Sequence, residues 1–270
     1  MAPDDGTSLR PAGSSVGGVL IAAYGMVVYV MFLLTFLYLI GFVADADFMV
    51  GDVHLVSKSI DRGGLGDGTL TVTAVVVDVL LLALFAVQHS VMARAGFKRW
   101  WTRVVPPSAE RSTYVLASNI CLIVLVAAWY PITHDIWRVT AQPWRTVLTA
   151  IALLGWTIAL LSTFLIDHFD LFGLRQVYAR LRGRRPAEHN FTTPFFYRVV
   201  RHPLYLGFLL AFWVTPRMTL GHLLFAVGTT CYILLAVRLE ERDLSRVFGE
   251  QYLDYRRRVP MLIPGLGGHS

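Results

Sequence analysis

The length, composition and charge of this chain point to a membrane protein. It has 270 residues, of which 55% are hydrophobic, and its formal net charge is +6 at pH 7. A mean hydropathy of +0.56 is too high for an ordinary soluble domain of this size. No nucleic-acid-binding module is visible, and arginines at the ends of membrane helices explain the positive charge.

Apolar runs along the chain predict helices that cross a bilayer. The long runs cover Val16–Val43, Leu70–Val91, Ser112–Tyr130 and Trp144–Ile166. Two further runs, Leu204–Val214 and Gly221–Leu239, predict a C-terminal helical hairpin. The expected fold class is therefore all-α, a polytopic membrane helix bundle of five to six transmembrane helices with a cytoplasmic tail after the hairpin. The number of crossings depends on whether the short first helix of the hairpin reaches the far side.

The distribution of charged residues predicts the orientation of the chain. Arginines and lysines gather in the loops after the second and fourth runs and in the C-terminal tail, whereas the loop after the first run is mainly acidic. By the positive-inside rule, the basic loops face the cytoplasm. We therefore expect an integral membrane protein with both termini in the cytoplasm. Residues 1–15, rich in Pro, Gly and Ser, are expected to form a flexible cytoplasmic tail.

Polar side chains inside or beside the apolar runs are candidate site residues, because such groups are costly in a bilayer. His89 lies near the cytoplasmic end of the second run, where it could bind or deprotonate a ligand or else form a hydrogen bond between helices. The fourth run ends with His168 and Asp170, and Arg175 and Gln176 follow. This cluster is as consistent with a binding site as with a helix cap and an ion-pair network.

The segment from Arg201 to Pro264 is the most distinctive part of the sequence. It begins with RHPLYLG and contains the two apolar runs of the hairpin. It ends with EERDL, FGEQYLDYRRRVP and MLIP. Because the two hairpin helices run in opposite directions, Glu240 and Glu241 return to the membrane level of Arg201 and His202. Acidic and basic residues that meet at a helix mouth indicate either a structural ion pair or a polar ligand site.

These motifs resemble the isoprenylcysteine carboxyl methyltransferase and phospholipid methyltransferase superfamily of integral membrane enzymes, which use S-adenosylmethionine. A narrower resemblance, to the bacterial methanethiol S-methyltransferases and the NnrU-like membrane proteins, rests on FAVQHSVMAR (85–94), KRWWTR (98–103), ERSTYVL (110–116) and HFDLFGLRQVY (168–178). It spans most of residues 85–264. The resemblance implies a membrane scaffold over residues 16–200, a methyltransferase core over residues 201–264, and a location in a bacterial cytoplasmic membrane.

The resemblance also implies a reaction, the methylation of methanethiol to dimethyl sulfide by S-adenosylmethionine at a membrane-embedded site that faces the cytoplasm. The RHPxYxG and EE motifs are then expected to build the cofactor pocket, and the tail to close over it. The expected cofactor-binding residues are Arg201, His202, Tyr205, Gly207, Glu240, Glu241, Tyr255 and Arg257. The candidates for a base that deprotonates the thiol are His202, His89 and His168. The expected substrate-binding residues are Asp170, Arg175, Gln176 and Phe208.

The expected partners are a small volatile thiol and the lipid bilayer, with no nucleic acid, no obligate protein partner and no metal. The eight histidines are scattered and match no metal-binding pattern. Two other functions remain open. The chain could methylate an isoprenylcysteine, a lipid or another thiol, and a lipid acceptor would require a wide lateral opening. It could also be a non-enzymatic NnrU-like transport or assembly protein, although such a protein has no need of RHPLYLG and EE together.

Overall fold

The helices of the molecule follow the apolar runs of the sequence. The computed structural model describes residues 16–47, 49–50, 53–183 and 192–265, so the tail expected over residues 1–15 lies outside the described residues. The helices are α1 (Val16–Val43), α2 (Val72–Ala93), α3 (Ala95–Trp101), α4 (Pro107–Ala128), α5 (Trp144–Ile166), α6 (His168–Leu171), α7 (Leu174–Leu181), α8 (Pro203–Trp213), α9 (Leu220–Phe248) and α10 (Glu250–Arg258), with a 3-10 helix, η1, at Phe195–Arg198. The strands are β1 (Met49–Val50), β2 (Val53–His54), β3 (Asp135–Arg138) and β4 (Arg217–Thr219).

The fold is an all-α membrane helix bundle, as the sequence predicts. Five helices, α1, α2, α4, α5 and α9, are long and apolar enough to cross a membrane. The bounds of α1 and α5 agree with the predicted runs. Helix α4 begins earlier than predicted, at Pro107, because proline is favoured in the first turn of a helix and Glu110 stabilises the N-terminus.

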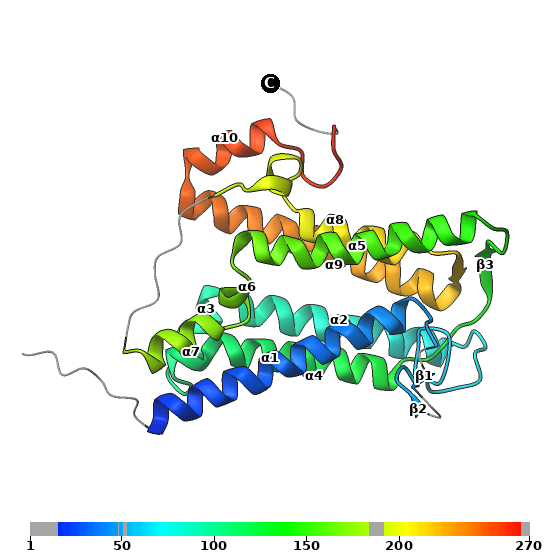
Figure 1. Cartoon of the computed structure of the whole chain (residues 1–270), viewed down its shortest axis with the longest axis horizontal. Coiled ribbons are helices and arrows are strands. Elements are labelled where there is room, and N and C mark those ends of the chain that lie inside the picture. Colours follow the sequence, from blue (N-terminus) through cyan, green and yellow to red (C-terminus); the bar gives the residue numbers. More distant parts are fainter. Residues whose placement is uncertain (1–15, 48, 51–52, 184–191, 266–270) are drawn as a thin grey trace, which may run out of the picture.

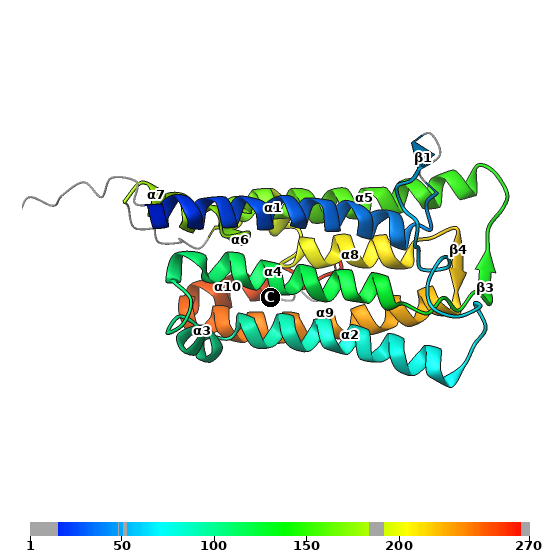
Figure 2. The same cartoon turned by 90° about the horizontal axis from the view of Figure 1, so that it is seen from below.

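The two ends of the bundle differ in their elements. Helices α3, α6, α7 and α10 gather at one end together with the start of α1, and the strands lie at the opposite end (Figures 1 and 2). We call the first the basic end, because its helices and loops carry most of the arginines that the structure describes, and the second the strand end. Helix α1 leaves the basic end and α9 returns to it, so the described chain crosses the bundle an even number of times.

The crossing between α5 and α9 consists of the short helix α8 and the extended segment after it. With 11 residues, α8 is about 17 Å long, which is shorter than the ~30 Å hydrocarbon core of a bilayer. After Trp213 the chain continues to β4, which pairs antiparallel with β3 at the strand end. Met218 and Thr219 are fully buried, so protein rather than lipid covers this non-helical backbone.

Helix α9 is longer than the sequence predicts. It continues past Leu239 to Phe248, because the glutamates, arginines and leucines that follow the apolar run are strong helix formers. Gly249, with a φ of 52°, ends the helix, and α10 follows at once. The glutamate pair therefore lies inside a helix rather than just after one.

Two glycines bring α5 and α8 into backbone contact. A Cβ atom at Gly155 would lie 2.6 Å from the carbonyl oxygen of Gly207, and one at Gly207 would lie 2.5 Å from the carbonyl oxygen of Gly155. Such small residues allow membrane helices to approach closely. Beside the contact, Trp156 packs edge-on against Phe208 and Phe212. The buried core continues through Phe42, Leu125, Trp129 and Phe225.

At the strand end, Arg217 joins three segments of the chain. Its guanidinium lies 2.8 Å from the carboxylate of Asp135, 3.3 Å from that of Asp61 and 3.8 Å from that of Asp45. Thr219 also donates a hydrogen bond of 2.6 Å to Asp61. Burial raises the pKa of Asp61 to about 6, although the Thr219 hydrogen bond and Arg217 act in the opposite direction. This network ties the loops after α1 and α4 to the hairpin.

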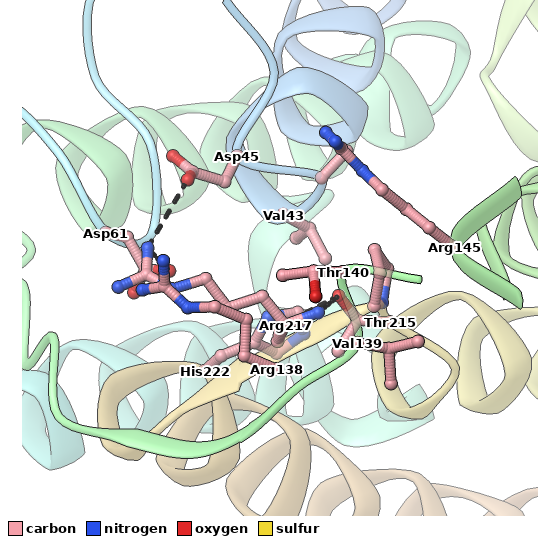
Figure 3. Close-up of a pocket in the computed structure, with 12 residues that line it drawn as sticks. Val43, Asp45, Asp61, Arg138, Val139, Thr140, Arg145, Thr215, Arg217 and His222 are labelled. Carbon is pink, nitrogen blue, oxygen red and sulfur yellow. Dashed lines mark hydrogen bonds and ion pairs between the residues drawn. The ribbon is translucent and has the colours of Figure 1, made fainter. Parts of the chain in front are cut away.

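A cavity of ≈ 250 Å³ lies beside this network, lined in part by Asp61, Arg217 and His222 (Figure 3). Asp61 and Arg217 are already paired with each other. The Nε2 atom of His222 lies 2.8 Å from the carbonyl oxygen of Phe212 and so links the two helices of the hairpin. These polar groups serve mainly to hold the loops and the hairpin together, and the RHPLYLG and EE motifs lie elsewhere.

The glycine contact generates a test of the fold. Gly207→Ala should destabilise the protein by about 1–3 kcal/mol, because the added methyl group meets backbone atoms that cannot rotate away. Thermal unfolding of the purified protein in detergent measures this change. Gly96→Ala in α3 is the matched control, because a Cβ at this position would meet nothing within 4 Å. The midpoint of thermal unfolding of this variant should be unchanged or slightly raised. An unchanged midpoint for Gly207→Ala would contradict the backbone contact.

Candidate active site

The two motifs of the hairpin meet in one cluster of charged side chains. The Nε atom of Arg201 donates a hydrogen bond of 2.7 Å to Oε1 of Glu241, and Nε2 of His202 lies 3.1 Å from the same oxygen. These three residues are between 5% and 8% exposed. Tyr205, one turn along α8, and Glu240 complete the group. We call Arg201, His202, Tyr205, Glu240 and Glu241 the hairpin cluster.

Arg201 also fastens the C-terminal tail. Its Nη1 atom donates hydrogen bonds to the carbonyl oxygens of Arg256 and Val259, at the end of α10, where backbone carbonyls lack helical partners. The backbone N–H groups of Arg201 and His202 donate to the carbonyl oxygens of residues 260–261, at 2.9 and 3.2 Å. The tail therefore lies across the mouth of the hairpin, and one buried guanidinium holds α8, α9 and α10 together.

The two neighbouring glutamates have different environments. Consecutive helical residues point about 100° apart, so Glu241 faces the buried pair while the side chain of Glu240 remains 45% exposed. The hydroxyl of Tyr205 donates a hydrogen bond of 3.2 Å to Oε2 of Glu240, and Nδ1 of His202 lies 3.9 Å from that oxygen. Glu240 is therefore the carboxylate of the pair that a bound molecule can reach.

Tyr255 lies where the tail meets the chain before α8. It is buried, and its hydroxyl donates a hydrogen bond of 2.6 Å to the carbonyl oxygen of Tyr197 in η1. Burial raises the pKa of Tyr255 to about 12, so the phenol keeps its proton at neutral pH. Its contact with Tyr197 holds η1 against α10.

Arg257 lies on the exposed face of α10, away from the position that the sequence suggests. It forms ion pairs with Asp254, one helical turn earlier, and with Glu250. Its neighbour Arg256 points in a different direction, and its Nε lies 3.6 Å from Oε2 of Glu241. The helical phase of α10 thus gives Arg256, rather than Arg257, the place beside the hairpin cluster.

Gly207 and Phe208 contact other helices. The close approach that Gly207 permits is that of α5 to α8, through the backbone of Gly155. The ring of Phe208 meets Trp156 edge-on and stacks with Phe212, with centroid separations of 5.9 and 5.6 Å. In this structure both residues serve helix packing, whereas the sequence suggests a cofactor contact for Gly207 and a substrate contact for Phe208.

His168 is enclosed by side chains of α1 and α5. The hydroxyl of Thr163 donates its proton to the carbonyl oxygen of Leu160, so it accepts a hydrogen bond of 2.7 Å from Nδ1 of His168. The Nε2 atom then accepts a hydrogen bond of 2.9 Å from the hydroxyl of Tyr29. The imidazole stacks on Phe164 at 3.9 Å, and burial lowers its pKa. Both ring nitrogens are occupied, and the neutral ring is favoured.

The polar residues after α5 contact one another. Nε2 of Gln176 donates a hydrogen bond of 2.9 Å to Asp170, and Arg175 forms an ion pair with Asp167. Asp167 also accepts a hydrogen bond of 3.1 Å from the backbone N–H of Asp170 and thereby caps α6. Of the two interpretations that the sequence leaves open, these contacts correspond to the helix cap and ion-pair network.

His89 lies on α2, in contact with α4 and α9. Its Nδ1 donates a hydrogen bond of 3.0 Å to the hydroxyl of Ser118, because that hydroxyl gives its own proton to the carbonyl oxygen of Tyr114. Its Nε2 accepts a hydrogen bond of 2.7 Å from the hydroxyl of Tyr114. The ring of Tyr232 in α9 meets the imidazole edge-on, with centroids 6.3 Å apart.

Several residues next to the hairpin cluster and next to His89 were not predicted from the sequence. Arg256 is one of three consecutive arginines, and only the phase of α10 distinguishes it from the other two. Tyr197 contributes a backbone carbonyl, which no side-chain motif can reveal. Tyr114 and Tyr232 lie within apolar runs, where a hydroxyl near His89 is the signal that could have identified them.

The hairpin cluster provides groups for an organic ligand. Within the part of the chain that the structure describes, no three or more His, Cys, Asp or Glu side chains form a group that could hold a metal ion. The exposed carboxylate of Glu240 can accept hydrogen bonds from an amine or a hydroxyl, and Tyr205 places a ring and a hydroxyl next to it.

Known proteins resemble this chain along most of its length, although no protein-family model matches it. It is 50% identical to methanethiol S-methyltransferase 2 of Bradyrhizobium diazoefficiens, over 91% of this chain and 90% of the relative. It is 51% identical to methanethiol S-methyltransferase of Mycobacterium tuberculosis, over 92% of this chain and 97% of the relative. A similarity of 34% identity to Nurim of Xenopus laevis covers 63% of this chain and 62% of that protein. The chain therefore belongs to the methanethiol S-methyltransferase family of methyltransferases.

Proposed function

We propose that this protein methylates methanethiol to dimethyl sulfide, with S-adenosylmethionine as the methyl donor. The choice of substrate is supported by relatives that are 50% and 51% identical and are named for this activity. The choice of site is supported by one observation above others. Glu240 keeps an exposed carboxylate beside the buried pair of Arg201 and Glu241, so a fixed framework presents one group that a ligand can reach.

The hairpin cluster fits S-adenosylmethionine by the chemistry of its free groups. When bound, this cofactor supplies a methyl group on a positively charged sulfur. Glu240 would accept hydrogen bonds from an amine or from ribose hydroxyls, with Tyr205 beside it. His202 contacts both glutamates, so we assign it to positioning Glu240 rather than to proton transfer. Arg201 is occupied by Glu241 and the tail, and we assign it to the framework of the site.

The acceptor that suits this site is small and apolar. A thiolate and a sulfonium neutralise each other's charge as they react, so a site that excludes water and holds the reacting atoms in line favours the step. Methanethiol dissolves in a bilayer, and the hairpin cluster lies where apolar helices end. The protein's contribution is then to position the reactants and to exclude water, and a base is needed only to ionise the thiol.

We place the site on the cytoplasmic side of a bacterial membrane, with both termini in the cytoplasm. The basic end carries Lys98 and Arg99 on α3, Arg175 and Arg180 on α7, and the arginines of α10. Such a concentration of basic residues beside membrane helices is typical of the cytoplasmic face. The lipid bilayer and the small thiol are the partners that this arrangement requires.

The reaction can be tested directly. Purified protein in detergent, given S-adenosylmethionine and methanethiol, should release dimethyl sulfide, which gas chromatography detects in the headspace. A reaction without protein is the control. Cofactor binding without dimethyl sulfide would contradict the proposed acceptor and favour a lipid or an isoprenylcysteine. Failure to bind the cofactor would contradict the proposed function and favour a non-enzymatic protein.

The two glutamates provide a matched pair of variants. Glu240→Gln should raise the KM for S-adenosylmethionine roughly 10- to 100-fold, since a hydrogen bond to a charged group contributes about 1.5–3 kcal/mol, and should leave the unfolding midpoint unchanged. Glu241→Gln should lower the free energy of unfolding by roughly 3 kcal/mol, because it leaves Arg201 buried without a counter-charge. Steady-state kinetics and thermal unfolding measure the two effects. An equal loss of stability in both variants would contradict the assignment of Glu240 to ligand binding and of Glu241 to the buried ion pair.

A further inference from the structure

A histidine and a tyrosine form a hydrogen-bonded pair next to the hairpin cluster. The Nε2 atom of His89 accepts the hydroxyl proton of Tyr114 in a bond of 2.7 Å. We propose that this pair takes up the proton that the thiol loses during methylation, with Tyr114 in contact with the thiol, His89 as the final acceptor and Ser118 as the residue that positions His89. The inference rests on the function proposed above and specifies which residues ionise its substrate.

The hydrogen bonds of the pair suit a proton acceptor. Because Ser118 gives its proton to the carbonyl oxygen of Tyr114, it must accept from Nδ1 of His89, which leaves the lone pair on Nε2. If Nε2 gains a proton, both ring N–H groups still have acceptors, namely the oxygens of Ser118 and Tyr114. The imidazole can therefore change its charge without breaking a hydrogen bond or moving a helix.

The position of the pair connects it to the proposed cofactor site. Tyr232 of α9 lies edge-on against His89, and it precedes Glu240 by about two turns of the same helix. Tyr205 of α8 donates a hydrogen bond to the same glutamate. His89, Tyr114, Tyr205 and Tyr232 are all partly exposed, so none of the four side chains is sealed inside the bundle.

His168 has a similar hydrogen-bond pattern but a different setting. Its Nε2 accepts from Tyr29 of α1, and its ring lies among Phe164 and Phe172. The ring is 2% exposed, which leaves a thiol no access to it. His202 is held by two carboxylates. Among the three candidate histidines, His89 is the one whose hydrogen-bond partner is both partly exposed and next to the hairpin cluster.

The proposed step conserves atoms and charge. The S–H bond of methanethiol breaks, its proton passes to the hydroxyl oxygen of Tyr114, and the proton of Tyr114 passes to Nε2 of His89. The electron pair of the S–H bond stays on sulfur and forms the new bond to the methyl group. Arg111 lies one helical turn before Tyr114 on α4. Its positive charge opposes a lasting imidazolium, so the proton is released to water after the product leaves.

The inference can be tested by varying the acidity of the thiol. With methanethiol and ethanethiol at neutral pH, Tyr114→Phe should lower kcat by about 10²-fold or more, the usual contribution of a general base. With trifluoroethanethiol, which is far more acidic, the same variant should approach the rate of the unaltered protein, because the thiol ionises without help. His89→Gln should show the same pattern. Tyr24→Phe is the matched control. Tyr24 lies on α1 and also donates a hydrogen bond to a residue of α4, Thr113, so its loss should leave kcat unchanged.

The outcomes separate this inference from the proposed function. An equal loss of kcat in Tyr114→Phe with all three thiols, or no loss, would overturn the inference while dimethyl sulfide formation by the unaltered protein still supports the function. If the larger thiols are not methylated, the pH profile with methanethiol decides, since the rate of Tyr114→Phe should rise with pH far more steeply than that of the unaltered protein. Calorimetric binding of S-adenosylmethionine and thermal unfolding should be unchanged in Tyr114→Phe. A lower midpoint together with weaker cofactor binding would show a structural role and overturn the inference.

Discussion

The arrangement of the whole C-terminal region depends on the bond between Arg201 and Glu241. A buried charge is stable only when it is paired and its remaining hydrogen-bonding groups are satisfied, and removal of one partner leaves the other uncompensated. Here the guanidinium meets the carboxylate of α9 and the last carbonyls of α10, while the backbone beside it pairs with the tail. Three helices and the tail are therefore fixed around one side chain, and this fixed framework makes the neighbouring Glu240 available as a ligand group.

The hairpin is held by an arginine at each of its ends. At the basic end, Arg201 joins α8 to α9 and α10, and at the strand end Arg217 joins β4 to the loops after α1 and α4. Between them the Gly155 and Gly207 contact presses α8 against α5. Helix α8 is too short to cross a bilayer alone, and these contacts explain how it keeps its place. The polar groups at the two ends of the hairpin differ in one respect. Those around Arg217 are paired with one another, whereas the carboxylate of Glu240 remains partly exposed and can meet a ligand.

The sequence was sufficient for the fold class, the membrane helices and the pairing of two distant motifs, because long apolar runs and a hairpin of opposite helices impose these features. The sequence was not sufficient where the phase of a helix determines which side chain faces the site. Arg256 and Arg257 are chemically equivalent in the sequence, and only the geometry of α10 places the first beside Glu241. Gly207 suggested room for a ligand, but a glycine also permits contact between helices, and only the position of α5 distinguishes the two. The pairing of His89 with Tyr114 joins two apolar runs whose relative rotation the sequence does not specify.

We propose that the cofactor binds at the hairpin cluster rather than in the cavity beside Arg217. Amide hydrogen exchange, followed by mass spectrometry with and without S-adenosylmethionine, distinguishes the two sites. Binding at the hairpin cluster should slow exchange at the start of α8, around Glu240 in α9 and in α10, with no change in β3 and β4. Slower exchange in β4 and at the start of α9, with none around Glu240, would contradict it.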